Sequence, residues 1–184
     1  MRRGPRAGRA GDRDEPKESR AMGETFSADE IFRIGVEIEK NGRTFYEEAA
    51  RRAADPACRK LFADLARWEN EHVAAFEELR AAATGAPAEG LEDSLDQTAG
   101  YLKAVADTHI FTREKDPAAL ARRARTPAEA LEAAIGFEKD SVVVYGSMRR
   151  LVPERLGRDK IEALVDEELR HVALLQDLLA RQRR

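Results

Sequence analysis

The sequence ENEHVA at residues 69–74 recurs as ELRHVA at residues 168–173, and this repeat is the strongest indication of the fold. Since 168 minus 69 is 99, the second copy lies 99 positions after the first. The same offset relates four further pairs, which are Glu39 with Glu138, Tyr46 with Tyr145, Leu65 with Leu164, and Leu79 with Leu178. Two halves of one chain therefore carry the same pattern, a lone glutamate followed at a fixed distance by Glu-x-x-His.

Helical periodicity predicts that these polar residues face a common core. Residues three or four apart share one face of a helix, so each Glu-x-x-His pair points in one direction. The other residues of the two faces are apolar, namely Phe62, Leu65, Phe76 and Leu79 in the first half and Ile161, Leu164, Leu175 and Leu178 in the second. Each lone glutamate has small neighbours on its own face, which we expect to leave room for coordination: Gly35 and Gly42 beside Glu39, and Ala134 and Ser141 beside Glu138.

The composition of the 184-residue chain indicates one all-α domain. Ala, Leu, Glu and Arg, which favour helices, are abundant, whereas there are only 12 Gly and 7 Pro. Capping signals predict long helices over residues 27–54, 56–83, 127–152 and 158–181, with shorter ones at 95–110 and after Asp116-Pro117. The long segment 85–125 is typical of a crossover connection between helices 2 and 3 of an antiparallel four-helix bundle.

The rest of the composition bears on partners and location. We expect residues 1–26 to form a disordered, basic N-terminal tail and residues 27–184 to form the bundle. A net charge of −3 from 32 basic and 35 acidic residues predicts no nucleic-acid partner. No apolar run approaches the roughly 18 residues of a membrane span, so no membrane partner is expected. The single cysteine, Cys58, cannot form an internal disulfide, which favours a cytoplasmic location.

Four glutamates that face one core predict a metal site. A buried carboxylate without a partner costs several kcal/mol, and no Lys or Arg lies on these faces to neutralise it. Two divalent cations would balance four carboxylates, and one glutamate from each of two helices with Glu-x-x-His from the other two is a known di-iron and di-manganese arrangement. Carboxylate and imidazole ligands suit iron or manganese. The predicted metal ligands and catalytic residues are Glu39, Glu69, His72, Glu138, Glu168 and His171.

Several neighbouring residues receive weaker predictions. We interpret Glu37, Glu71 and Glu167 as solvated, because they lie off the inward faces. Tyr46 and Tyr145 are expected to pack in the core and to donate a hydrogen bond to a ligand carboxylate, with a redox role as the alternative. Trp68 is expected beside the site or at a subunit interface. His109 is interpreted as a structural or surface residue.

These residues and motifs resemble the rubrerythrin family within the ferritin-like superfamily. The resemblance covers residues 27–181 and includes the phrases IEKNGRTFYEEAA, ENEHVAAF, YLKAVADTHIF, AIGFEKDSVVVYGSM and EELRHVALL. It implies that Glu69 and Glu168 bridge two irons, that Glu39 and His72 complete one site, and that Glu138 and His171 complete the other. It also implies reduction of hydrogen peroxide or consumption of oxygen, with the irons cycling between ferrous and ferric states.

The sequence departs from typical rubrerythrins at informative positions. One cysteine cannot build the four-cysteine rubredoxin module, so electrons would come from an external donor protein. Ser141 stands where typical members place a further glutamate, which questions the peroxide-specific iron movement of the family. Asn70 follows Glu69 where bacterioferritins place a haem-ligating methionine, so no haem is expected.

The predicted function is that of a di-iron oxidoreductase in oxidative-stress or iron handling, acting as a homodimer. Its substrate would be hydrogen peroxide, dioxygen or ferrous iron. Two alternatives use the same ligands, a non-catalytic iron-binding protein and an oxygen-activating hydroxylase. Manganese in place of iron, as in a manganese catalase, also stays open.

Overall fold

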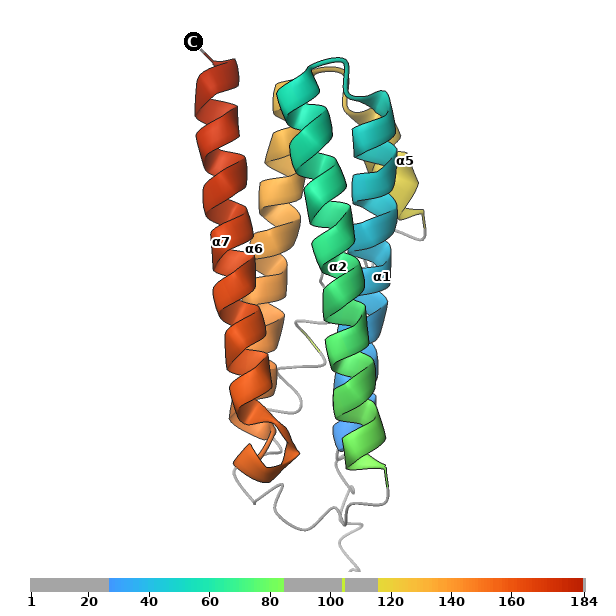
Figure 1. Ribbon diagram of the computed structural model, residues 1–184, viewed down its shortest axis with the longest axis vertical. Coiled ribbons are helices and arrows are strands. Elements are labelled where there is room, and N and C mark those ends of the chain that lie inside the picture. Colours follow the sequence, from blue (N-terminus) through green and yellow to red (C-terminus); the bar gives the residue numbers. More distant parts are fainter. Residues whose placement is uncertain (1–26, 85–103, 105–115, 184) are drawn as a thin grey trace, which may run out of the picture.

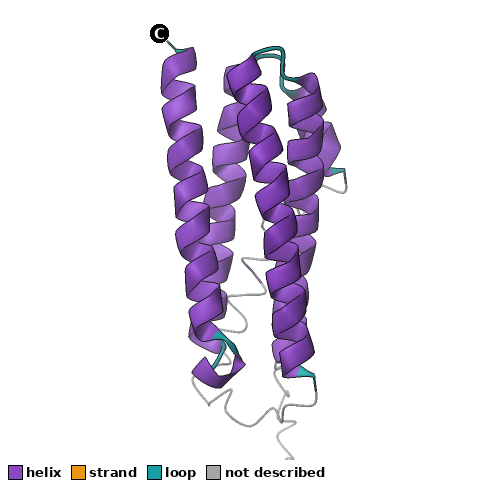
Figure 2. Cartoon of the chain, viewed as in Figure 1, coloured by secondary structure: helices purple, strands orange, loops and turns teal. Residues whose placement is uncertain are grey.

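The computed structural model describes residues 27–84, 104 and 116–183, and every regular element in them is helical (Figures 1 and 2). The elements are α1 (Ala28–Arg52), α2 (Pro56–Ala83), α5 (Pro117–Arg123), α6 (Pro127–Leu151), a 3₁₀ turn (Glu154–Leu156) and α7 (Arg158–Gln182). The predicted all-α four-helix bundle is confirmed. The expected tail at 1–26, the expected helix at 95–110 and His109 lie outside the described residues, so the division at residue 27 stays a prediction.

The capping residues begin the helices where the sequence predicts. Ser27 and Glu30 form a complete capping box at the start of α1. The side chains of Asp55, Asp116 and Thr126 cap the next three helices, each of which has a proline at its start. The last turn differs, because Gly157 precedes α7 with φ 96°, a left-handed conformation that favours glycine.

The four long helices form two antiparallel hairpins, α1 with α2 and α6 with α7 (Figure 1). In Figure 1, α1 and α7 run in one direction and α2 and α6 in the other, while α5 lies against α1. The end of α2 and the start of α6 therefore lie at opposite ends of the bundle, which explains the long connection between them. This is the ferritin-like arrangement with one crossover. Within the described residues, no helix is both long and apolar enough to cross a membrane.

The small residues beside Glu39 mainly leave room for aromatic rings. A Cβ at Gly35 would lie 2.5 Å from Phe76 Cε1, and a Cβ at Gly42 would lie 2.6 Å from Phe137 Cζ. The space is therefore filled by two buried aromatic rings from α2 and α6. The prediction that the space serves coordination is wrong at Gly35, where all three nearest atoms belong to Phe76. At Gly42 the missing Cβ leaves room for Phe137 and also for the carboxyl group of the candidate ligand Glu69.

This packing predicts opposite effects for alanine at two glycines within helices. Gly42→Ala would press on Phe137 and on Glu69 Cδ, which is 3.3 Å from the added Cβ, so we expect a loss of about 1–3 kcal/mol in unfolding free energy. Gly136→Ala meets no atom within 4 Å and should stabilise by up to about 1 kcal/mol through helix propensity. Chemical denaturation of both variants tests this, and equal effects would contradict the packing described.

Candidate metal centre

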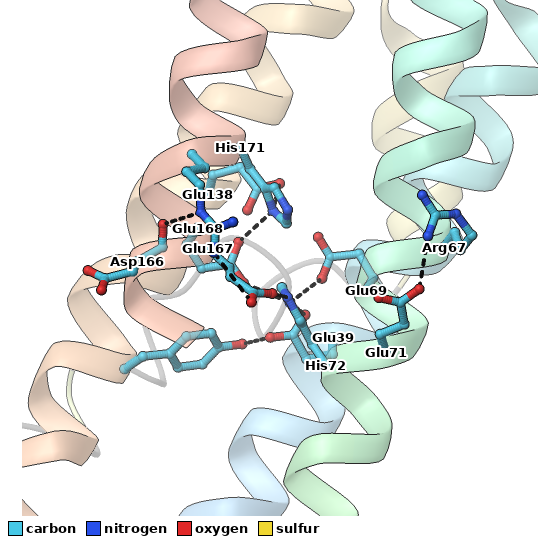
Figure 3. Close-up of polar contacts among 12 residues, drawn as sticks. Glu39, Arg67, Glu69, Glu71, His72, Glu138, Asp166, Glu167, Glu168 and His171 are labelled. Atoms are coloured by element: carbon cyan, nitrogen blue, oxygen red, sulfur yellow. Dashed lines mark hydrogen bonds and ion pairs between the residues drawn. The ribbon is translucent and has the colours of Figure 1, made fainter. Parts of the chain in front are cut away.

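Six polar side chains meet inside the bundle from all four long helices, and Figure 3 shows them converging. Glu39 comes from α1 and Glu138 from α6, while α2 and α7 each supply a glutamate and a histidine one turn apart. None is more than 5% exposed. The structure therefore brings together all six residues that the sequence predicts as ligands: Glu39, Glu69, His72, Glu138, Glu168 and His171.

The six residues form two overlapping groups that can each hold a metal ion. One group consists of Glu39, Glu69, His72 and Glu168, and the other of Glu69, Glu138, Glu168 and His171. Within each group, one candidate ligand atom per residue lies within 4.8 Å of the others. Glu69 and Glu168 belong to both groups, as two carboxylates that bridge a pair of ions would.

The polar atoms of this cluster lack sufficient partners of their own. His72 Nδ1 lies 3.0 Å from Glu168 Oε1 and 3.6 Å from Glu39 Oε2, without a hydrogen bond to either. Within the described part of the chain, six buried atoms of the cluster have no hydrogen-bond partner: Glu39 Oε2, both oxygens of Glu69, His72 Nδ1, Glu138 Oε2 and Glu168 Oε1. Burying such atoms without partners is costly, and metal coordination would satisfy them. The donor set thus fits two hard or borderline cations such as iron or manganese.

Mutual electrostatics keep protons in this cluster. Burial, together with Glu39 and Glu138, raises the pKa of Glu69, and burial together with Glu168 raises that of Glu138. Burial opposes a charge on the histidines, but the glutamate carboxylates close to each ring outweigh this effect and raise the pKa of His72 to about 12 and of His171 to about 9. Metal ions would have to displace these protons, so binding should strengthen as the pH rises.

Two tyrosines connect the halves crosswise. The Tyr46 hydroxyl of α1 donates to Glu138 of α6, and the Tyr145 hydroxyl of α6 donates to Glu39 of α1. Burial raises the pKa of both phenols well above the usual value, so they act as neutral donors. The expected hydrogen bonds to candidate ligands are present, each to the glutamate of the other half.

Glu167 contradicts its sequence-based interpretation as a solvated residue. Its Oε2 lies 2.8 Å from His72 Nε2, although the side chain remains 42% exposed. Glu167 points about 100° away from the inward Glu168, toward α2, so it reaches the outer edge of the imidazole. Glu37 and Glu71 agree with the interpretation, since both are exposed and Glu71 pairs with Arg67 at 2.9 Å.

Trp68 packs against the other histidine, as expected for a residue beside the site. Its ring stacks on His171 with centroids 5.2 Å apart and an interplanar angle of 13°. Arg67 covers the indole with its guanidinium carbon 5.4 Å from the ring centroid. Cys58 does not lie beside the metal centre. It is buried near the turn between α1 and α2, where burial raises its thiol pKa to about 12.

The fold and the cluster together define a helical bundle with a candidate two-metal carboxylate centre, and comparison with known proteins supports this class. Residues 30–116 match the family model described as Rubrerythrin, which confirms the resemblance to rubrerythrins over that segment. Rubrerythrins bind a di-iron centre, and the matched segment contains Glu39, Glu69 and His72. The positions of Glu138, Glu168 and His171 rest on the internal repeat and on their geometry. No curated protein and no solved structure matches the chain significantly.

Proposed function

We propose that the protein is a non-haem di-iron oxidoreductase. It reduces hydrogen peroxide or dioxygen with electrons from an external donor protein, or it oxidises ferrous iron. The observation that carries this proposal is the pair of overlapping ligand groups sharing Glu69 and Glu168. Iron held there would supply reversible ferrous–ferric chemistry. Reduction of one peroxide breaks its O–O bond and consumes two electrons and two protons, giving two water molecules. Iron in this centre would supply those electrons, and the donor protein would restore them.

The surroundings of the cluster favour small oxidants over a large apolar substrate. A cavity of about 270 Å³ reaches the centre at His171, and three of its lining residues are charged: Glu71, Glu167 and Arg170. An oxygen-activating hydroxylase would need an apolar pocket for its substrate. Tyr46 and Tyr145 hold neutral hydroxyl groups on Glu138 and Glu39, so these carboxylates are oriented before any substrate arrives.

The proposal is tested by oxidation of the ferrous protein. Anaerobic protein loaded with ferrous iron is mixed with hydrogen peroxide or with dioxygen, and ferric absorption is followed by stopped flow. We expect saturable oxidation that is much faster than in the Glu69→Ala variant treated in the same way. Equal rates in the two proteins would contradict an enzyme and favour a non-catalytic iron-binding protein. Light scattering tests the predicted homodimer separately.

Ser141 offers a prediction about oxidant choice. It is 1% exposed and lies one turn after Glu138 on α6, so its side chain faces the interior. The described site gives each group one lone glutamate, one histidine and two shared glutamates, with no spare carboxylate. We expect the ferrous protein to react with both oxidants and Ser141→Glu to shift the rate ratio toward peroxide.

Ser141→Gln is the matched control for this change, because it adds similar volume without a carboxylate. Stopped-flow rates with each oxidant should leave the ratio in Ser141→Gln near that of the unmodified protein. An equal shift in both variants would attribute the effect to crowding, and no shift in either would show that a further carboxylate does not determine selectivity.

A further inference from the structure

Equivalent positions in the two halves have different chemistry beside the histidines. Trp68 precedes Glu69 and Glu167 precedes Glu168, so the two residues share the offset that relates the ligand groups. Glu167 contacts His72 from outside the cluster, whereas Trp68 stacks on His171. Six candidate ligands are thus related by the repeat, but the residues that support the two histidines are not.

The contact with Glu167 prepares His72 as a ligand. The Nε2–H group donates to Glu167 Oε2 at 2.8 Å, so Nδ1 is the nitrogen that would coordinate a metal ion once its proton is displaced. That nitrogen faces the cluster and lies 3.0 Å from Glu168 Oε1. A carboxylate behind a ligating imidazole fixes its tautomer and orientation and makes it a stronger donor, and losing such a partner typically costs about 10–100-fold in metal affinity.

His171 has no comparable support. In the described ranges, no hydrogen bond is recorded for its Nε2, and its Nδ1 contacts Glu168 Oε2 at 3.1 Å. Trp68 limits the rotation of the ring by stacking but offers no acceptor. The cavity of about 270 Å³ also opens against His171, Trp68 and Leu174, so this histidine lies on the side of the cluster closest to solvent.

We propose that the two metal positions are inequivalent. The position formed with Glu39 and His72 binds its ion first and more tightly, and the position formed with Glu138 and His171 binds second and exchanges its ion through the cavity. Glu167 and Trp68 are the positioning residues that create this difference. The inference rests on the proposed function, in which the cluster holds two ions.

Titration of the full-length apoprotein with Co²⁺ tests the order of binding, because Co²⁺ replaces Fe²⁺ without oxidation and has a visible spectrum. We expect two steps whose affinities differ by about 10-fold or more. Trp68 is the only tryptophan in the chain, so its fluorescence reports on the His171 side. The larger part of the quenching should accompany the second equivalent, and the first should appear mainly in the cobalt absorption.

Variants then assign each step to its residues. Glu167→Gln should weaken the first step about 10-fold and leave the second unchanged. Glu162→Gln removes an exposed charge on the same helix, where Glu162 pairs with Arg149 at 3.0 Å, and should change neither step. Trp68→Phe keeps a stacking ring and should preserve the order of binding, as read by absorption.

Three outcomes would overturn the inference. Two ions bound with equal affinity, quenching complete at the first equivalent, or an unchanged first step in Glu167→Gln would each contradict it while leaving the proposed function intact. Failure of the protein to bind Co²⁺, Fe²⁺ or Mn²⁺ at all would overturn both.

Discussion

Replacing Glu69 by alanine is expected to remove most of both metal ions, so that a protein with about two ions per chain retains few or none. Glu69 contributes to both ligand groups, and both its oxygens are buried without a hydrogen-bond partner within the described residues. Its loss takes one ligand from each position at the same time. Glu168→Ala should act in the same way, because Glu168 is the other shared residue. Elemental analysis of purified, iron-loaded protein provides the measurement.

Two control variants separate this effect from general damage. His72 belongs to one group only, so His72→Ala should weaken mainly one ion. Glu78→Ala changes an exposed glutamate on the same helix, away from the cavity at His171, and should leave the metal content intact. Full metal content in Glu69→Ala would remove the basis for a bridged pair.

Metal addition is expected to raise the melting temperature of the apoprotein substantially. A ligand present at about 100 times its dissociation constant stabilises the folded state by about 2.7 kcal/mol, which corresponds to roughly 5–10 °C for a domain of this size. The buried carboxylates are the reason, because their repulsion and desolvation oppose folding until a cation neutralises them. Glu138→Gln removes one of these charges, so it should stabilise the apoprotein and reduce the gain from metal. Differential scanning calorimetry with and without metal would reveal a buried site, and identical melting temperatures would argue against one.

The rise in melting temperature on metal addition should also become larger between about pH 6 and about pH 8. Folded Glu69 and Glu138 have raised pKa values, so their contribution to apoprotein stability is lost as the pH rises above about 4.3, the unfolded value. His72 and His171 have pKa values raised to about 12 and about 9. Their contribution to apoprotein stability is therefore lost as the pH rises above about 6.5, the unfolded value for histidine. Glu168 has a lowered pKa, and its contribution is already complete in this range. The apoprotein therefore weakens with pH while metal binding strengthens, and melting curves at several pH values would show the difference.

The sequence predicted those features that depend on local periodicity. Capping residues placed the starts of α1, α2, α5 and α6, and the repeat with its inward faces identified all six side chains that converge in the bundle. Features that depend on how helices approach one another were missed. The contact of Glu167 with His72 crosses from α7 to α2. The position of a residue around its own helix does not show whether a side chain of a neighbouring helix lies within its reach. The aromatic rings that fill the space beside Gly35 and Gly42 likewise come from other helices.

The distribution of ligands between the hairpins has a consequence for how the protein holds together. The α1–α2 hairpin supplies three residues of one group but only Glu69 of the other, and the α6–α7 hairpin supplies the reverse. Neither hairpin can complete a metal position alone, and the tyrosine bonds also cross between them. The free energy of metal binding is therefore also free energy of association between the two hairpins. Removing the metal should separate the two hairpins before either one unfolds, which would make their docking responsive to the supply of metal ions.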